Sequence, residues 1–290
     1  MSGKAKAENV QNIPITDIHP FEDHPFKVLD DELMQSTVES VSKFGVLNPV
    51  IVRPDENGGY EMISGHRRLR ACELAGVKEI PAIVRDLTRD EAIILMVDSN
   101  LQRETILPCE RAAAYKMKMD ALKRQGQRTD LTSGQLDPKL NHRRSNQIVA
   151  DDAGESVKQV QRYIRLTELI PELQDKVNSK EIAFTPAVEL SFLRPEEQKT
   201  LLDAMEYAQT TPSLSQAQKL KKLSQMHQCK AATMYSVMSE EKKSDIDRIT
   251  FKCNDLQKYF PKSYTPRRME ETILRLLEQW QKKREQQQER

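Results

Sequence analysis

The feature that most constrains this chain is a strand–glycine–helix junction that carries three arginines. Residues 60–64 are β-prone and alternate in character, which predicts a strand. Gly65 interrupts this pattern, and good helix formers then run to Gly76, a residue typical of a helix C-terminus. Strands are also expected at residues 10–15, 49–53 and 80–84, with helices between them. The first part of the chain is therefore predicted to be a small α/β domain with the junction near its centre.

The arginines of this junction, Arg67, Arg68 and Arg70, favour the binding of an anion. Free N–H groups and the positive end of the helix dipole attract negative charge to a helix start. Guanidinium groups add bidentate phosphate contacts that lysine does not reproduce. Gly65 is expected to let the backbone approach a ligand closely. The residues alone also allow a simpler interpretation, which is an exposed basic helix start without a ligand.

Length and composition set broad bounds on the protein. A chain of 290 residues with 31% charged, 38% hydrophobic and 5% aromatic residues is typical of a helix-rich protein with two or more domains and small cores. The net charge of +1 means that nucleic-acid binding would need a local basic patch. The four cysteines lack metal or disulfide spacing, and neither a signal peptide nor a long apolar run is present. These features predict a reducing cytoplasm.

A pair of short helices follows in the middle of the chain. Residues 145–154 predict a helix that ends in glycine, and residues 156–166 predict a second helix. Two helices joined by a short glycine turn are typical of a helix-turn-helix. Asp151 and Asp152 are expected to point away from DNA phosphates. The outward set on the second helix suits major-groove readout, with Gln for adenine and Arg for guanine or phosphate: Lys158, Gln159, Gln161, Arg162 and Arg165. An unrelated helical hairpin is the alternative.

The arginine segment resembles the Gly-Glu-Arg-Arg-x-Arg-Ala box of the ParB family, the DNA-segregation proteins of bacterial chromosomes and plasmids. In that family the box belongs to a pocket for the triphosphate of CTP. Residues 43–50 and 99–104 resemble two more family segments, which serve the base and sugar and the magnesium and triphosphate. Residues 145–166 resemble the family's helix-turn-helix, which reads a palindromic centromere site. The resemblance covers roughly residues 10–210 in matching order.

The resemblance implies a ParB/Noc-like architecture of three parts. These are an α+β N-terminal domain of the ParB/sulfiredoxin type, an all-α helix-turn-helix domain and a helical C-terminal tail. The expected boundaries are 1–9 for a disordered N-terminus, 10–107 for the nucleotide-binding domain, 108–210 for the DNA-binding domain and 211–290 for the tail. The tail is expected either to dock on the rest of the chain or to self-associate, the second by analogy with the family's dimerisation domain.

The resemblance also implies two sets of site residues. The nucleotide-binding set comprises Gly45, Gly65, His66, Arg67, Arg68, Arg70, Asn100 and Arg103. The implied cofactors are CTP and Mg²⁺, with Asn100 as the metal ligand. The DNA-binding set comprises Ser145, Ser156, Lys158, Gln159, Gln161, Arg162 and Arg165.

Three positions depart from the family pattern. His66 stands where the box has Glu, Ser99 replaces the Glu of a Glu-Asn pair, and residues 24–26 lack the arginine of an Asn-Pro-Arg motif. Serine is a weak, neutral magnesium ligand. At most a weak CTPase activity is therefore expected, and no catalytic residue is assigned. Nucleotide binding is still expected because the arginines and Asn100 remain.

The leading interpretation is a sequence-specific DNA-binding partition protein of a chromosome, plasmid or mobile element that CTP closes into a sliding clamp. The expected partners are palindromic double-stranded DNA, a second copy of the chain and a ParA-type ATPase engaged through a basic N-terminus with Lys4 and Lys6. No membrane partner is expected, and the expected location is the cytoplasm, on the nucleoid. A second interpretation is a transcription regulator without the nucleotide switch. A third is a nuclease or nucleotide-dependent kinase of the same fold type, which no acidic metal cluster supports.

Apolar periodicity and caps predict several details. A helix capped by Asp30 or Asp31 is expected to bury Leu33, Met34, Val38, Val41 and Phe44. A long helix over residues 110–124 is expected to give way to a loop or linker over residues 126–142. Ser156 and Gln159 are expected to form a capping box, and Thr185 to cap a later helix. The expected helical core is Val188, Leu190, Phe192, Leu201, Leu202 and Met205, and the last helix carries an apolar stripe of Met269, Ile273, Leu276, Leu277 and Trp280.

Overall fold

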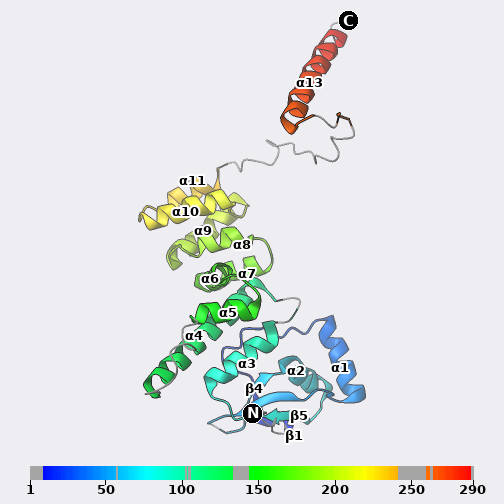
Figure 1. Cartoon of the computed structure of the whole chain (residues 1–290), viewed down its shortest axis with the longest axis vertical. Coiled ribbons are helices and arrows are strands. Elements are labelled where there is room, and N and C mark those ends of the chain that lie inside the picture. Colours follow the sequence, from blue (N-terminus) through cyan, green and yellow to red (C-terminus); the bar gives the residue numbers. More distant parts are fainter. Residues whose placement is uncertain are drawn as a thin grey trace. The chain divides into compact units, whose positions relative to one another are not determined.

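The computed structural model describes residues 9–56, 58–101, 103, 106–132, 144–240, 259–261 and 264–288. Lys4, Lys6 and most of the expected disordered N-terminus lie outside these residues. The chain forms two compact units, residues 1–239 and residues 240–290. The first begins with an α/β domain and continues in helices, which confirms the predicted fold class (Figure 1).

A five-stranded mixed sheet forms the centre of the first domain. Its order is β1-β5-β3-β4-β2. The strands are β1 (Val10–Pro14), β2 (Ile18–His19), β3 (Val50–Pro54), β4 (Tyr60–Ser64) and β5 (Glu79–Val84), and a 3₁₀ turn, η1 (Ile15–Asp17), joins the first two. Strand β1 is antiparallel to β5, and β3 is antiparallel to β4, whereas the β5–β3 and β4–β2 pairs are parallel.

Strand β4 is buried on both faces because helices cover both sides of the sheet. On one side Met62 packs in a core with α1 (Glu32–Phe44) and α2 (His66–Ala75). On the other side Ile63 packs with α3 (Arg89–Leu101) and α4 (Pro108–Thr132). Helix α3 begins with a capping box, in which the Glu91 carboxylate accepts the Thr88 N–H at 2.9 Å.

The buried face of helix α1 is narrower than predicted. Its cap is as expected, since Asp31 accepts the Met34 N–H at 2.8 Å. Met34 and Val41 are buried, but Leu33 and Phe44 are 70% and 69% exposed, so their assignment to the core is wrong. At 100° per residue, both lie about 80–100° around the helix from Met34. Both therefore lie on the same flank of the helix, outside the narrow stripe of Met34 and Val41 that packs in the core.

Helix α4 is longer than predicted. It begins at Pro108 and continues to Thr132, beyond the expected residues 110–124, so the predicted loop is wrong at residues 126–132. Gly126 lowers helix stability by only about 1 kcal/mol relative to alanine, and no proline follows it within the helix. The rest of the expected loop, residues 133–142, lies outside the described residues.

The pair of short helices lies where the sequence predicts. Helix α5 (Ser145–Ala153) ends at Gly154, whose φ is +65°, and α6 (Val157–Arg165) begins directly after Ser156. The Ser156 hydroxyl accepts the Gln159 N–H at 3.2 Å. The Gln159 side-chain oxygen accepts from Arg162 at 3.2 Å, so the described contacts contain only the serine half of the expected capping box.

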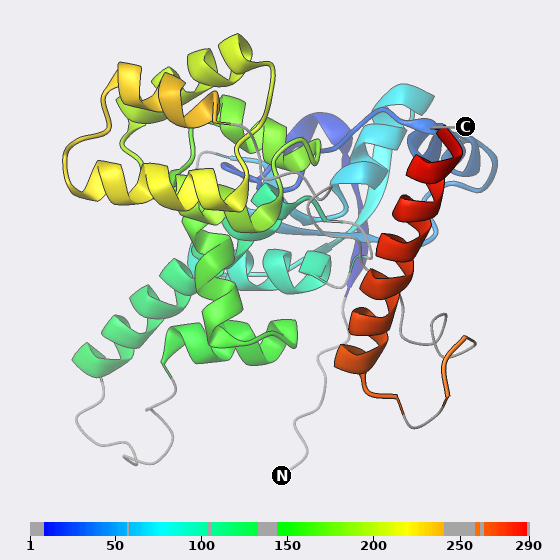
Figure 2. The same ribbon diagram turned by 90° about the horizontal axis from the view of Figure 1, so that it is seen from above.

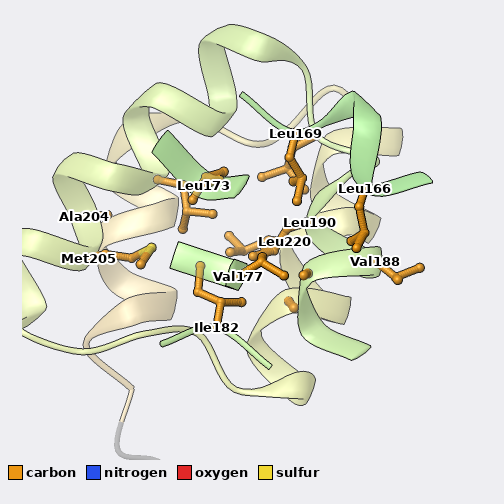
Figure 3. Close-up of a cluster of buried hydrophobic side chains, with 14 of the residues drawn as sticks. Leu166, Leu169, Leu173, Val177, Ile182, Val188, Leu190, Ala204, Met205 and Leu220 are labelled. Atoms are coloured by element: carbon orange, nitrogen blue, oxygen red, sulfur yellow. The ribbon is translucent and has the colours of Figure 1, made fainter. Parts of the chain in front are cut away.

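The remaining helices of the first unit surround one core. They are η2 (Leu166–Glu168), α7 (Pro171–Asn178), α8 (Phe184–Leu190), α9 (Pro195–Ala208), α10 (Leu214–Gln225) and α11 (Ala231–Met238). Figure 2 shows α8 to α11 gathered into one bundle, and Figure 3 shows side chains such as Leu173, Leu190 and Leu220 converging inside it.

Two predictions for this bundle are wrong. The N-cap of α8 is Ala183, and Thr185 is already inside the helix, where its hydroxyl accepts a hydrogen bond from Arg162 at 3.0 Å. Phe192 is 38% exposed instead of belonging to the core. Its ring carries cations, as described below, and a ring used in this way needs access to the surface.

The second unit contains α13 (Pro266–Gln288). Met269, at the start of the expected apolar stripe, is buried, whereas Leu276, Leu277 and Trp280 are exposed. The expected self-association of the tail therefore remains a prediction. None of the described helices is long and apolar enough to span a membrane.

Candidate functional site

Gly65 is required by packing and backbone conformation. Its φ is +117°, and a Cβ at this position would lie 2.5 Å from Cγ1 of Val50 in β3. The sequence predicts that glycine lets the backbone approach a ligand. The structure gives a different reason, which is the positive φ and the close contact with Val50. Because Gly65 is the N-cap of α2 and has no side chain, it cannot accept the first N–H groups of that helix. The helix start therefore lacks a side-chain cap of its own.

Two of the predicted arginines bind other parts of the domain. Arg70 forms ion pairs with Asp30 at 2.7 Å and Glu73 at 3.1 Å. Arg68 donates to the carbonyl oxygens of residues 48 and 49 at 2.5 and 2.8 Å. These contacts attach α2 to the segment before α1 and to the loop before β3. Both arginines therefore have structural roles.

The other two guanidinium groups are less compensated. Arg67 has an ion pair of 3.3 Å with Asp31. The Arg103 guanidinium carbon lies 5.8 Å from the centre of the Phe26 ring, and no carboxylate of the described residues lies within ion-pair distance of Arg103. Burial, followed by repulsion from Arg67, lowers the pKa of Arg103. Two cations that repel each other beside an uncapped helix start favour an anion between them.

A stacked pair of histidines belongs to the same site. The His66 ring, on the first residue of α2, lies 3.7 Å centre to centre from the His24 ring, with an angle of 32° between their planes. The Nε2 atom of each ring is buried and has no hydrogen-bond partner among the described residues. Burial lowers the pKa of His24 to about 4 and that of His66 to about 3. Both rings are therefore neutral at pH 7.

Asn100 and Gly45 are less closely tied to this cluster. Asn100 is buried in the last turn of α3, where its Nδ2 donates to the Met96 carbonyl at 2.8 Å. The Ser99 hydroxyl donates to the same carbonyl at 2.9 Å. The neutral side chains of Ser99 and Asn100 are poor ligands for magnesium, because this ion prefers carboxylates or phosphate oxygens. Gly45 ends α1 with a φ of +71°, in open space.

The charge of Arg103 acts on His66 and that of Arg67 acts on Arg103, so these three side chains lie in one site. No group of three or more His, Cys, Asp or Glu side chains that could hold a metal ion occurs in the described ranges. Sequence reasoning missed His24 and Phe26 as members of this site. Their position in the loop aligned with the Asn-Pro-Arg motif was the available signal.

A groove of about 710 Å³ along α6 is the second candidate site. Its described lining residues are Met119, Lys123, Arg144, Ser145, Asn146, Lys158, Gln161, Arg162, Ile164, Arg165, Val188 and Phe192. Five of these are Lys or Arg and none is acidic, so the groove attracts anions although the net charge of the chain is only +1. Five of the seven predicted DNA-binding residues line it, whereas Ser156 and Gln159 do not.

Neighbouring helices hold the two arginines of α6. Arg162 donates to the Thr185 hydroxyl at 3.0 Å. Arg165 donates to the Ser191 carbonyl, and its guanidinium carbon lies 4.1 Å from the centre of the Phe192 ring. These contacts orient both guanidinium groups before any ligand binds. Lys158 and Gln161 are exposed and keep their freedom.

The sequence analysis missed Lys123, Arg144 and Phe192 as lining residues. Arg144 follows Arg143, and this basic doublet before a helix start was a usable signal. Phe192 carries a second cation, because Lys221 Nζ lies 3.7 Å from its ring centre. Lys221 also pairs with Glu189 at 2.8 Å, so it is not simply solvated. No local pattern marks Lys123.

A buried lysine connects the two sites. Lys118 of α4 has a side chain that is 1% exposed, and its Nζ lies 2.5 Å from Asp98 of α3 and 2.6 Å from Asp152 of α5. Asp152, an acid near the expected DNA helix, is thus held by the buried Lys118 while its own side chain is 46% exposed. Asp151 accepts from Gln147 at 2.8 Å. The α/β domain and the helix pair therefore share one ionic cluster.

Comparison with known proteins identifies the N-terminal domain. Residues 1–101 match the ParB N-terminal domain. The chromosome-partitioning protein ParB of Myxococcus xanthus is 39% identical over 142 residues, which are 49% of this chain and 45% of that protein. The chromosome-partitioning protein Spo0J of Thermus thermophilus is 32% identical over 188 residues, 65% of this chain and 62% of that protein. The chain thus spans about half to two thirds of the length of these relatives.

Two solved structures are also similar. One is C-terminally truncated ParB from Caulobacter crescentus complexed to the centromeric parS site, with 23% identity, coverage of 73% of this chain and 98% of that chain, and a TM-score of 0.43. The same protein complexed with CTP-gamma-S has 26% identity, coverage of 63% and 92%, and a TM-score of 0.32.

The sequence matches define the class: the chain is a relative of bacterial chromosome-partitioning proteins. It carries the N-terminal domain of the ParB family, as the arginine box predicts.

Proposed function

We propose that this chain is a sequence-specific DNA-binding partition protein of a bacterial chromosome, plasmid or mobile element, and that CTP switches it. The observation that carries the proposal is the pair of mutually repelling guanidinium groups, Arg67 and Arg103, at the uncapped start of α2. A triphosphate brings about four negative charges and removes this repulsion. The same compact unit contains the basic groove along α6.

Nucleotide binding would use the site as follows. The phosphates lie at the start of α2, where Arg67, Arg103 and the first N–H groups neutralise them. Arg68 fixes the loop before β3 through its carbonyl oxygens, and this loop supplies the base contact by the family resemblance. Phe44 and Leu47, on either side of Gly45, are exposed apolar side chains that offer surface to a base. Magnesium would enter with the phosphates, and no catalytic step is assigned to it.

DNA binding would use the groove along α6. Lys158 and Gln161 are free to reach base edges, while Arg162 and Arg165 are held in place for guanine or phosphate. Lys123 and Arg144 extend the positive surface along the groove. A palindromic site requires a second copy of the chain. A homodimer, a ParA-type ATPase as partner and a nucleoid location in the cytoplasm complete the proposal, on the strength of the family.

In this proposal the nucleotide acts mainly through binding. Binding energy would favour a closed clamp on DNA. Ser99 in place of a carboxylate leaves at most a weak CTPase.

The test is calorimetric titration of the full chain with CTP, ATP, GTP and UTP plus magnesium, with and without palindromic DNA. We expect CTP-selective binding that Arg67→Ala and Arg103→Ala each weaken at least about tenfold, since each removes a charge-assisted phosphate contact. Arg275→Ala, which changes an exposed arginine of α13, is the control and should bind like the parent chain. Binding unaffected by both site variants would contradict the proposed site.

A second candidate is a helix-turn-helix transcription regulator without a nucleotide switch. The contacts of Arg68 and Arg70 favour it, because both side chains already have protein partners. His66 and Ser99 also depart from the family pattern. No binding of any nucleotide, with DNA binding intact, would establish this second candidate.

A further inference from the structure

The His24–His66 stack is a pair of buried titratable groups that the proposed function leaves unused. The rings lie face to face at 3.7 Å, so their in-plane nitrogen atoms cannot bond to each other. The two Nε2 atoms are sealed from solvent and lack a partner in the described part of the chain. Buried nitrogen atoms without a partner are rare in proteins and call for a bound group that pairs with them, such as an oxygen that accepts from a protonated Nε2.

The cations around the pair oppose its protonation. Arg103 acts unfavourably on both protonated rings, and Arg67 lies near enough to repel Arg103. Among the described residues, two acidic groups act on these arginines: Asp31 pairs with Arg67 at 3.3 Å, and Glu110 of α4 acts on Arg103. Its carboxylate accepts the Lys27 backbone N–H at 2.9 Å, and that of Leu107 at 3.3 Å. An anion at the guanidinium pair would reverse the sign of this field.

We propose that His24 and His66 are the proton-accepting part of the nucleotide site, and that binding of a polyphosphate at Arg67 and Arg103 adds a proton to the pair. The inference rests on the proposed nucleotide site and adds a regulation to it. No bond forms or breaks other than the N–H bond at one Nε2, and the proton comes from solvent. The pair thus makes nucleotide affinity depend on pH within the cytoplasmic range.

Linkage fixes the sign of this dependence. Where binding takes up one proton, affinity falls tenfold for each unit rise in pH. The terminal phosphate of a free nucleotide has a pKa of about 6 and loses its proton in a cationic site, which gives the opposite sign. The contribution of the histidines is therefore the difference between the parent chain and a variant without them.

The experiment is titration of the full chain with CTP and magnesium at pH 6.5 in two buffers of different ionisation enthalpy, which counts protons. We expect the parent chain to take up about 0.5–1 proton more than His66→Gln or His24→Asn. Between pH 6 and 7 its affinity should fall about three- to tenfold relative to these variants. His227→Gln, which changes an exposed histidine on another part of the chain, should match the parent chain.

Proton counts that are equal in the parent chain and both variants, with CTP bound, overturn this inference and leave the proposed function standing. No heat of CTP binding in any buffer overturns both. If a variant does not fold, the ring Cε1–H signals of the parent chain decide by nuclear magnetic resonance. With CTP, one of the two rings should titrate between pH 5 and 8, and two rings that stay neutral at pH 6 overturn the inference.

Discussion

Lys118 allows a sharp test of how the two parts of the first unit are coupled. Its ammonium group is buried, whereas the carboxylates of Asp98 and Asp152 that hold it are 43% and 46% exposed. This asymmetry predicts that removing the acids costs more stability than removing the lysine. The comparison uses Lys118→Met against the double variant Asp98→Asn with Asp152→Asn.

The magnitudes follow from the exposure of each group. Lys118→Met keeps the packed aliphatic stem and loses two contacts to half-exposed carboxylates, each worth about 1 kcal/mol or less. Relief from burying an ammonium ion offsets this loss, so the net change should be within about 1 kcal/mol. The double variant leaves a buried cation without a counter-ion, which costs about 3–5 kcal/mol. A polar cleft of about 400 Å³ beside Asp98 and Asp152 admits water and favours the lower value.

The assay is urea unfolding followed by circular dichroism, with free energies compared among the parent chain, both single acid variants, the double variant and Lys118→Met. Each single variant leaves one carboxylate on Lys118, so the double loss should exceed the sum of the single losses. A loss for Lys118→Met as large as that for the double variant would refute the reasoning. Strict additivity of the two acid variants would refute it as well.

Three further predictions follow from contacts described above. Gly65→Ala should destabilise the chain by at least about 2 kcal/mol in thermal unfolding, because its Cβ would lie 2.5 Å from Val50; a loss below about 0.5 kcal/mol would contradict this. Acidification from pH 7.5 to 5 should lower the free energy of unfolding by up to about 2 kcal/mol for each of His24 and His66. Their folded pKa values of about 4 and 3 lie below the unfolded value of 6.5. The unfolded chain therefore binds more protons than the folded chain in this pH range. The double variant His24→Asn with His66→Gln should flatten that part of the urea-derived stability curve, and an unchanged slope would argue against burial of the pair. Phe192→Leu should weaken DNA binding about three- to tenfold in fluorescence anisotropy by removing cation–π contacts, and unaltered affinity would exclude this role.

The strand–glycine–helix junction could be predicted because its determinants are local. The alternation before Gly65, the helix formers after it and the glycine at its C-cap all act within a few residues. The same holds for the caps at Asp31 and Ser156. Composition and order along the chain then sufficed for the fold class.

Features that depend on distant partners could not be predicted. Lysine is seldom buried, so nothing in the sequence near Lys118 indicates that two acids from other helices enclose it. Phe192 has an apolar side chain that suits a core, but cations from α6 and α10 fix it at the surface. The stacking of His24 on His66 joins residues 42 positions apart.

The sequence predicted which arginines form the candidate site better than it predicted what each of them contacts. The arginine cluster lies at the helix start as expected, but its members differ in their contacts: Arg70 pairs with Asp30, whereas Arg103 lies over the Phe26 ring and has no ion pair with a carboxylate among the described residues. Spacing within one helix says which side chains share a region. It does not say which of these side chains already have hydrogen-bond or ion-pair partners elsewhere in the domain.

Helix α4 sets a register between the cores it joins. Cys109 and Ala112 pack in the bundle core, Tyr115 packs with the helix pair, and Ala114 and Ala121 pack under the sheet. One extra residue between the first and last of these would turn one core by about 100° relative to the other and shift it by about 1.5 Å. Evolution can therefore vary the side chains of this helix but not its length between these contacts. Insertions and deletions in related chains are expected elsewhere.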